Sequence, residues 1–281
     1  MHISTMKAPY LLFGIVSAVV AAPAYQSAPN CTKAALQEVT DAYVAAQTAG
    51  KLDPLSKFLS TGWKYTENNK DIDAAKGVIN KALKLDNRRS IYDLVQCATY
   101  TEIISAEAAN PYVIGTQLRF DNALKITLID TIASTTNSWL FDAKKTLSYV
   151  QQEKWDPIPE AKYDSRKAIQ DAGDAYMDMW SNATAHTFVP WGTPCTRLEG
   201  SAYTGKGKAD DSCQPGIPSN HNQAPNTHRR YVIDQSMGSV SLFCVWEHMM
   251  MAADAHEFRL EGGKLRYVHT MTVCGGQPCK L

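Results

Sequence analysis

An internal repeat constrains the fold of this chain more than any other feature. Short motifs in the first half recur in the second half, in the same order and at offsets of about 132 to 141 residues. The matched segments are Asp41-Ala42-Tyr43 with Asp174-Ala175-Tyr176, Glu67 with Glu199, Arg88-Arg89-x-x-x-Asp93 with Arg229-Arg230-x-x-x-Asp234, Leu118-Arg119 with Phe258-Arg259, and the segment from Lys125 to Ile132 with that from Lys264 to Met271. We therefore predict two copies of one domain in tandem, each of ordinary domain size.

Both copies have the same predicted order of elements. A helix (34–50 or 164–181) and a short second helix precede a first strand (62–67 or 195–200). Alternating apolar residues and turn signals then predict four strands, at 88–95, 97–107, 111–121 and 124–134 in the first copy and at 229–236, 239–248, 254–261 and 264–273 in the second. The first copy has an extra expected helix at 74–85. Helices packed on a curved antiparallel sheet form an α+β cone, so we expect two tandem cones.

The expected boundaries are a first domain at 30–136, a connector at 137–163, a second domain at 164–274 and a tail at 275–281. Lys7 precedes an apolar run from Leu11 to Ala22, which is shorter than the roughly 20 residues that span a bilayer. We interpret 1–24 as a secretory signal peptide, with a membrane anchor or an N-terminal core helix as the alternative. Sequons for N-glycosylation begin at Asn30 and Asn182. We expect a protein of the secretory pathway, secreted or in a vesicular lumen, without a stable membrane span.

Cysteine usage agrees with that compartment. The chain has 7 cysteines and no Cys-x-x-Cys pair, so a zinc ribbon or a thioredoxin-like motif is not expected. Cys195 and Cys213 flank a Gly-rich polar loop and form the first predicted disulfide. Cys31 with Cys97 is the second. The odd count leaves at least one free thiol, for which Cys244, in an apolar strand pattern, is the candidate.

Charge and missing motifs exclude several classes of function. The chain has 28 basic and 28 acidic residues and a pI near 7, so it lacks the basic footprint of a nucleic-acid-binding protein. The sequence contains no Gly-rich phosphate loop, no Gly-x-Ser-x-Gly elbow, no HExxH and no dinucleotide fingerprint. We expect no cofactor and no metal, and a small molecule as substrate or ligand.

The order of elements resembles the NTF2-like superfamily, which includes ketosteroid-isomerase-like and polyketide-cyclase (SnoaL)-like proteins. Four segments also resemble a family of secreted fungal proteins of unknown function. They are Pro111 to Gln117, Val189 to Cys195, Arg229 to Asp234, and His256 to Arg259 continued by Tyr267 to Thr270. The resemblance implies a ligand pocket on the concave, helix-facing side of each sheet. It also implies sheets that serve as dimerisation faces, and therefore an intramolecular pseudo-dimer of the two copies.

The last hairpin carries the first candidate site. The Gly-Gly pair at 262–263 is a two-residue turn signal. If this turn sets the register, His256 opposes His269 and Phe258 opposes Tyr267, all on one face of the sheet. The resemblance places that face in the pocket, where a histidine pair suits general acid/base catalysis near neutral pH. The alternative is that both histidines are satisfied core residues or bond the loop before Arg229.

The equivalent positions in the first copy are Thr116 and Asp130. An aspartate inside an apolar cone has a raised pKa and suits proton transfer, unless strand pairing exposes Asp130 at an edge. Tyr112 and Tyr267 are candidates for polarising a substrate carbonyl. Glu67 ends the first strand, near the expected pocket mouth. A capping or rim role is the alternative for Tyr112 and Glu67.

Arg89 and Asp93 lie four residues apart on one strand, and Arg230 and Asp234 repeat the pattern. Because both copies carry the pattern, we interpret it as a structural ion pair rather than a substrate clamp.

Two functions follow from these observations. The first is a cofactor-independent acid/base enzyme of the cyclase, isomerase or lyase type, acting on a small apolar intermediate. The resemblance implies fungal secondary metabolism for it, with the dimerising cyclisation of maleidrides as one instance. The second is a secreted, non-catalytic protein that binds a small ligand or acts at a surface.

Overall fold

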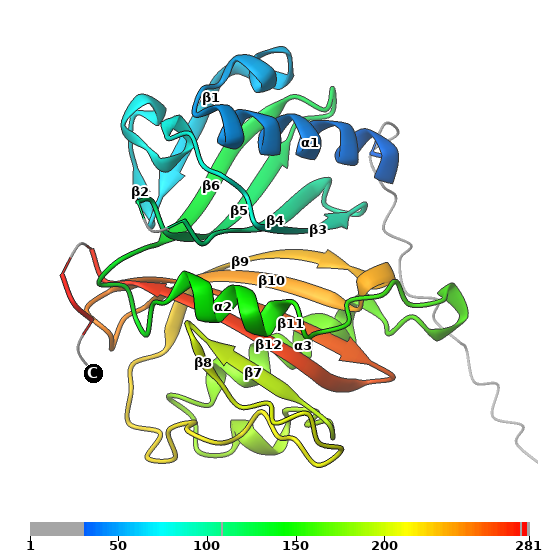
Figure 1. Cartoon of the computed structure of the whole chain (residues 1–281). Coiled ribbons are helices and arrows are strands. Elements are labelled where there is room, and N and C mark those ends of the chain that lie inside the picture. The colour runs from blue at the N-terminus through cyan, green and yellow to red at the C-terminus, as the bar shows by residue number, and fades with distance from the viewer. Residues whose placement is uncertain (1–30, 108, 276, 280–281) are drawn as a thin grey trace, which may run out of the picture.

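The computed structural model describes residues 31–107, 109–275 and 277–279. Two α+β units lie one above the other in Figure 1, and each consists of helices on one face of a curved, six-stranded sheet. This is the tandem α+β architecture that the repeat predicts. The expected signal peptide at 1–24 and the sequon at Asn30 lie outside the described residues.

The first unit begins with helix α1 (Lys33–Ala49), which is capped by the side chain of Thr32 and ends at Gly50 in the left-handed conformation. The remaining elements are η1 (Asp53–Phe58), β1 (Leu59–Glu67), β2 (Lys70–Asp71), η2 (Ala74–Lys76), η3 (Val78–Asn80), β3 (Asn87–Asp93), β4 (Ala98–Ser105), β5 (Tyr112–Phe120) and β6 (Ile126–Ser134). The strand order is β2-β1-β6-β5-β4-β3. Neighbours are antiparallel except β1 and β6, which are parallel.

The second unit repeats this topology. Its elements are α3 (Arg166–Asp178), η5 (Ala185–Thr187), β7 (Thr196–Glu199), β8 (Ala202–Tyr203), β9 (Asn226–Asp234), η6 (Gln235–Met237), β10 (Ser239–Trp246), β11 (Ala252–Glu261) and β12 (Lys264–Val273). The strand order β8-β7-β12-β11-β10-β9 is that of the first sheet, and β7 joins β12 in parallel as β1 joins β6. Equivalent residues also pair at equivalent places, since Glu67 lies opposite Thr131 and Glu199 opposite Thr270.

The structure corrects one predicted helix and adds another. The helix expected at 74–85 is two short 3-10 turns, η2 and η3, separated at Gly77. Gly77 has extended backbone angles (φ −82°, ψ 170°), which interrupt the helix, and a side chain there would overlap the Tyr65 ring. The connector contains a helix that was not expected, α2 (Ala143–Val150), and the short turn η4 (Glu160–Lys162).

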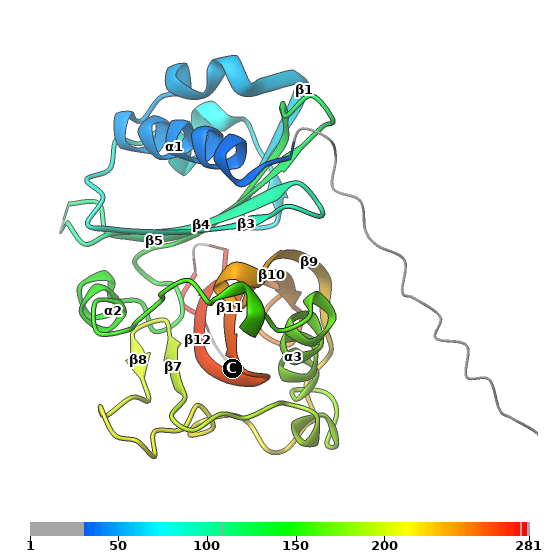
Figure 2. The ribbon, with the colours of Figure 1, turned by 90° about the vertical axis from the view of Figure 1, so that its right-hand side faces the viewer.

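The two sheets pack against each other through the faces opposite their helices (Figure 2). Ile91 and Tyr100 of the first sheet share one hydrophobic cluster with Val232 and Phe243 of the second. Two hydrogen bonds from backbone N–H groups to aspartate side chains repeat across this interface: Tyr92 N donates to Asp234 Oδ2 at 2.9 Å, and Ile233 N donates to Asp93 Oδ2 at 3.0 Å. Because equivalent residues exchange equivalent bonds, the units form an intramolecular pseudo-dimer with a pseudo-two-fold interface.

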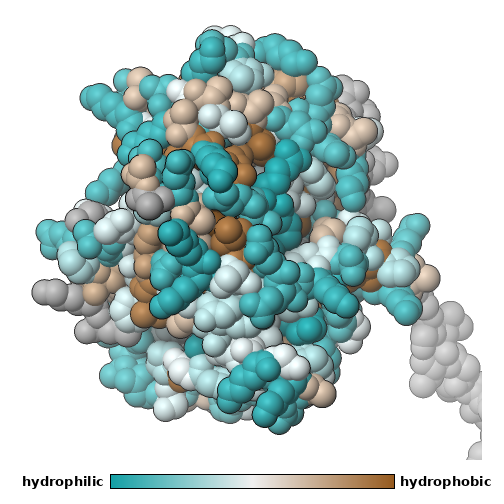
Figure 3. Space-filling model, in the orientation of Figure 1, coloured by the Kyte–Doolittle hydropathy of each residue, from teal (hydrophilic) through white to brown (hydrophobic). Residues whose placement is uncertain are grey.

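Three disulfides join Cys31 to Cys97, Cys195 to Cys213 and Cys274 to Cys279. The first two pairings and the free, buried thiol of Cys244 were predicted, whereas the third was not. These bridges are typical of an oxidising compartment. In the described part of the chain, no helix combines the length and hydrophobicity needed to cross a bilayer. The face in Figure 3 is largely hydrophilic, with hydrophobic side chains showing between the two units.

Candidate active site

The second cone contains a row of polar side chains across three adjacent strands. Glu199 on β7 pairs with Thr270 on β12, and Thr270 pairs with His256 on β11. Side chains paired in this way lie on the same face, and neighbouring strands are about 4.8 Å apart. The His256 ring lies 5.7 Å from that of Tyr176 on α3, so the row faces the helix. Glu199 and His256 therefore flank Thr270 inside the cone.

Glu199 is the carboxyl group of this row. Trp139 Nε1 donates to its Oε1 at 3.2 Å, and Arg197 Nε lies 3.8 Å from Oε2. Burial raises the pKa of Glu199, and the nearby charge of Arg197 offsets this only in part. Its side chain is 16% exposed, so the carboxyl is largely desolvated but still reachable.

His256 lies on the other side of Thr270 and is buried. Its ring stacks on Phe258 at 5.5 Å, and Nδ1 lies 3.1 Å from Asp254 Oδ2. The angle of this contact does not make a hydrogen bond, so Nδ1 has no hydrogen-bond partner among the described residues. Asp254 in turn accepts a hydrogen bond of 2.7 Å from Thr272 Oγ1.

A pocket of about 300 Å³ opens onto Glu199. Trp139, Trp180 and Trp246 line it together with Arg197. Arg197 is 6% exposed, and its Nη1 donates to Tyr176 Oη at 3.4 Å, while burial raises the pKa of that tyrosine to about 12. Aromatic walls around a few polar groups are typical of small-molecule sites.

The expected pairing of His256 with His269 is wrong. Gly262 and Gly263 both have positive φ, as the predicted turn requires, and Leu260 pairs with Leu265 beside the turn. A β-bulge between Arg259 and Leu260 then shifts the register by one residue. His256 consequently lies opposite Thr270, and Glu257 opposite His269. A shift of one residue moves every later side chain to the other face, so His269 points out of the cone.

His269 lies between the two sheets, in a buried cluster that we call the inter-sheet ion cluster: Arg89, Glu102, Glu153, Glu257 and His269. His269 Nδ1 is 3.0 Å from Glu102 Oε2, and its Nε2 is 2.6 Å from Glu153 Oε2. Burial alone would lower the pKa of His269, but the two carboxylates outweigh it and raise the pKa to about 10. The imidazole is therefore a structural cation at neutral pH.

Asp130 is displaced from the first cone in the same way. A bulge between Arg119 and Phe120 repeats the one in the second hairpin, and Asp130 consequently points towards the second sheet. Arg230 Nε donates to Asp130 Oδ2 at 2.6 Å, and Thr66 Oγ1 donates to Oδ1 at 2.8 Å.

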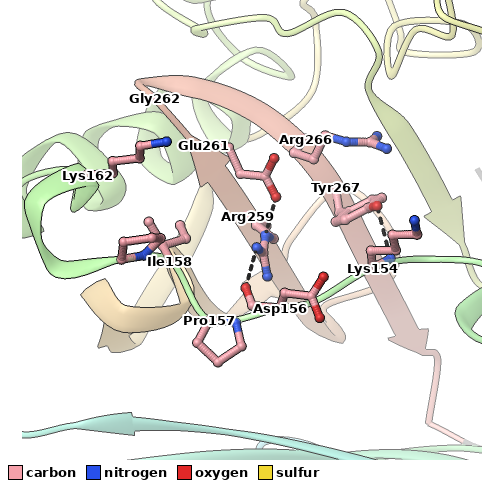
Figure 4. A pocket seen from close by; sticks show the side chains of 11 residues that line it. Lys154, Asp156, Pro157, Ile158, Lys162, Arg259, Glu261, Gly262, Arg266 and Tyr267 are labelled. Carbon is pink, nitrogen blue, oxygen red and sulfur yellow. Dashed lines mark hydrogen bonds and ion pairs between the residues drawn. The ribbon is translucent and has the colours of Figure 1, made fainter.

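The two candidate tyrosines lie apart from each other and from the row. Tyr112 Oη accepts a hydrogen bond of 2.8 Å from Lys81 Nζ in the first unit. Tyr267 Oη accepts one of 3.1 Å from the backbone N–H of Lys154, and its ring stacks on Trp155 at 5.2 Å. Figure 4 shows Tyr267 with Arg259 in the wall of a surface pocket of about 670 Å³ beside the connector.

The repeated arginine and aspartate motifs are structural, but their partners differ from those predicted. Arg230 bonds Asp130 of the other unit, and Arg89 Nη2 lies 2.5 Å from Glu257 Oε2 of the other unit. Asp93 is bonded by Arg166 at 2.6 Å rather than by Arg89.

Glu199 was not among the residues predicted as catalytic. The sequence marked Glu199 only as the repeat of Glu67, for which a capping or rim role was the alternative. In the first cone, Glu67 does have such a structural role. Glu67 Oε2 accepts hydrogen bonds from Tyr65 Oη and from Val78 N, both at 2.6 Å. The equivalent carboxyl in the second cone has a single hydrogen-bond donor among the described residues, Trp139.

A family described as a domain of unknown function (DUF8021) matches residues 162–272, within the second half of the chain. No curated protein matches the chain. Among solved structures, a "Putative Isomerase" from Rhodopseudomonas palustris is 12% identical over 37% of this chain and 92% of its own, with a TM-score of 0.28. AclR, "a putative hydroxylase" from Streptomyces galilaeus, is 12% identical over 46% of this chain and 92% of its own, with a TM-score of 0.25.

Proposed function

We propose that the second cone is the active site of a cofactor-independent enzyme that transfers a proton within a small, mostly apolar substrate. The reaction would be an isomerisation, a cyclisation or an elimination. The observation that carries this proposal is the row of Glu199, Thr270 and His256, because Glu199 lines an aromatic pocket and His256 lies two strands away on the same face of the sheet.

Glu199 suits the role of general base and acid. A carboxyl whose pKa is raised by burial binds and releases a proton closer to neutral pH than an exposed one does. His256 supplies the second ionisable group, which returns a proton to a different atom. Arg197 in the pocket wall suits stabilisation of the negative charge that develops on a carbonyl oxygen. In an isomerisation or a cyclisation the proton leaves one atom of the substrate and is returned at another, and in an elimination it passes to the leaving group, so none of these reactions requires an oxidant.

His256 is thus the one residue predicted from the sequence that takes part in the proposed reaction, and Glu199 joins it. His269 and Asp130 are bound in ion pairs between the sheets, and Tyr267 packs under the connector. Tyr112 belongs to the first cone, where Lys81 donates to its hydroxyl. We assign these four residues to structure rather than to proton transfer.

Deletion of the gene followed by complementation tests the proposal before the substrate is known. Metabolite profiles are compared in the source organism with and without the gene. We expect one product to disappear and an isomeric or uncyclised precursor to accumulate. Complementation with Glu199→Gln should fail, because loss of a general acid/base typically costs about 100- to 10,000-fold in rate.

The matched control is Glu67→Gln, at the equivalent position of the first cone, which should restore the product. If Glu199→Gln restores the product as well as the wild-type gene does, the assignment of the active site is wrong. An unchanged profile upon deletion, under conditions of expression, would instead favour a non-catalytic ligand-binding protein.

A further inference from the structure

A second pocket, of about 340 Å³, lies between the two units. Leu128 and Asp130 of β6 form part of its wall, and Arg230 of β9 and Val245 of β10 contribute to it from the other unit. The proposed proton transfer uses none of these residues.

The repeat gives this pocket a counterpart elsewhere in the pseudo-two-fold interface. The equivalent residues are Leu128 and Tyr267, Asp130 and His269, and Arg230 and Arg89, at offsets of 139, 139 and 141. Trp155 of the connector lies against the second member of each pair. Its ring is 5.2 Å from that of Tyr267, 5.3 Å from that of His269 and 3.6 Å from Arg89 Cζ. The counterpart is therefore filled by an indole ring that belongs to the chain itself.

The chemistry of the filled counterpart is specific. The indole covers the flat face of the Arg89 guanidinium, and Trp155 Nε1 donates to Glu153 Oε2 at 2.9 Å. The same carboxylate oxygen is 2.6 Å from His269 Nε2. The Trp155 indole thus makes two interactions at this position: its ring stacks on a guanidinium, and its N–H group donates to a carboxylate.

The open pocket offers the same two groups. The Arg230 side chain is 28% exposed, against 10% for Arg89 under its indole. The carboxylate is supplied by Asp130 itself, which occupies the position of His269. Leu128 and Val245 provide an apolar wall. Stacking of an aromatic ring on the guanidinium of an arginine is favourable.

We propose that this pocket binds a planar aromatic molecule with an N–H or O–H donor, of the kind that Trp155 provides at the counterpart. The ring lies on the guanidinium of Arg230, and its donor bonds the Asp130 carboxylate. This inference does not depend on the proposed enzyme activity, because the pocket lies outside the second cone.

Indole is the probe for this site, added to the full chain with labelled methyl groups. Nuclear magnetic resonance should show saturable shifts of the Leu128 and Val245 methyl signals. Leu128→Trp fills the pocket with an attached indole and should reduce the shift of Val245 about tenfold or more. The control Leu94→Trp, at an exposed loop position, should leave it unchanged.

Arg230→Lys provides a second variant that keeps the positive charge beside Asp130 but removes the flat guanidinium face. Indole affinity should fall about fivefold, within the range of a lost stacking contact. Methyl signals that do not move at saturating indole would overturn the proposal. So would a Val245 shift that is the same in Leu128→Trp as in the wild-type protein.

Discussion

The inter-sheet ion cluster predicts how the stability of this protein depends on pH. His269 has a pKa of about 10 in the folded protein, against an ordinary value of 6.5. A group whose pKa is raised by folding stabilises the fold while it is protonated. Its contribution is therefore complete below about pH 6.5 and is lost as the pH rises through about 10. Stability should decline across that window.

The size of the effect follows from the same shift. A pKa of about 10 against 6.5 corresponds to at most about 5 kcal/mol, because each pH unit is worth about 1.4 kcal/mol. His269→Gln removes the cation and leaves Glu102 and Glu153 buried with less compensation. Breaking a buried ion pair from one side costs about 3–5 kcal/mol. The variant should be destabilised by that amount near pH 6, and the difference from wild type should shrink towards pH 10.

Urea unfolding at intervals between pH 6 and 10 measures this dependence. The matched control is His228→Gln, since His228 is exposed and lies outside the cluster. In the control, the free energy of unfolding should change with pH as it does in the wild-type protein. Lysines and tyrosines that titrate at high pH affect both proteins equally, so the comparison removes their contribution. If His269→Gln has the same slope as the control, or if wild-type stability rises with pH, the assignment of a buried imidazolium is wrong.

Three further predictions concern the connector, a disulfide and a sequon. Trp155→Ala should lower the free energy of unfolding by about 3 kcal/mol or more, and millimolar indole should restore part of it in thermal melts, because the vacated site matches the probe. Replacing Cys31 and Cys97 by alanine should cost about 4 kcal/mol in chemical denaturation, against about 2 kcal/mol for the 274–279 bridge, since the closed loop spans 66 residues rather than 5. Asn182 is exposed, so a chain made in a eukaryotic secretory host should lose the mass of one glycan in Asn182→Gln, and an unchanged mass would refute occupancy.

Much of the fold could be predicted because the repeat and the turn residues give independent signals. The strands expected at 88–95 and 111–121 are found at Asn87–Asp93 and Tyr112–Phe120. The turn at 262–263 forms as predicted because glycine tolerates the positive φ that it requires. Alternation, turn chemistry and the repeat all indicate the same elements.

The face of each side chain could not be predicted in the same way. Strand β11 is buried along nearly its whole length, because α3 covers one face and the first sheet covers the other. A strand buried on both faces loses the alternation that would reveal a shifted register. The sequence pattern therefore gave no sign of the bulge beside Arg259. Because of that bulge, the His269 side chain points into the interface between the sheets rather than into the cone.

The repeat also explains why the two copies can perform different tasks. In a symmetric homodimer, equivalent positions carry identical residues and have identical surroundings. Within one chain they are free to differ, as Asp130 and His269 do in the interface and Glu67 and Glu199 do in the cones. Glu67 holds the first cone together through two hydrogen bonds, whereas Glu199 faces an aromatic pocket. We therefore expect Glu67→Gln to leave the reaction intact even where it lowers stability, and Glu199→Gln to abolish the reaction, since Glu199 borders an aromatic pocket.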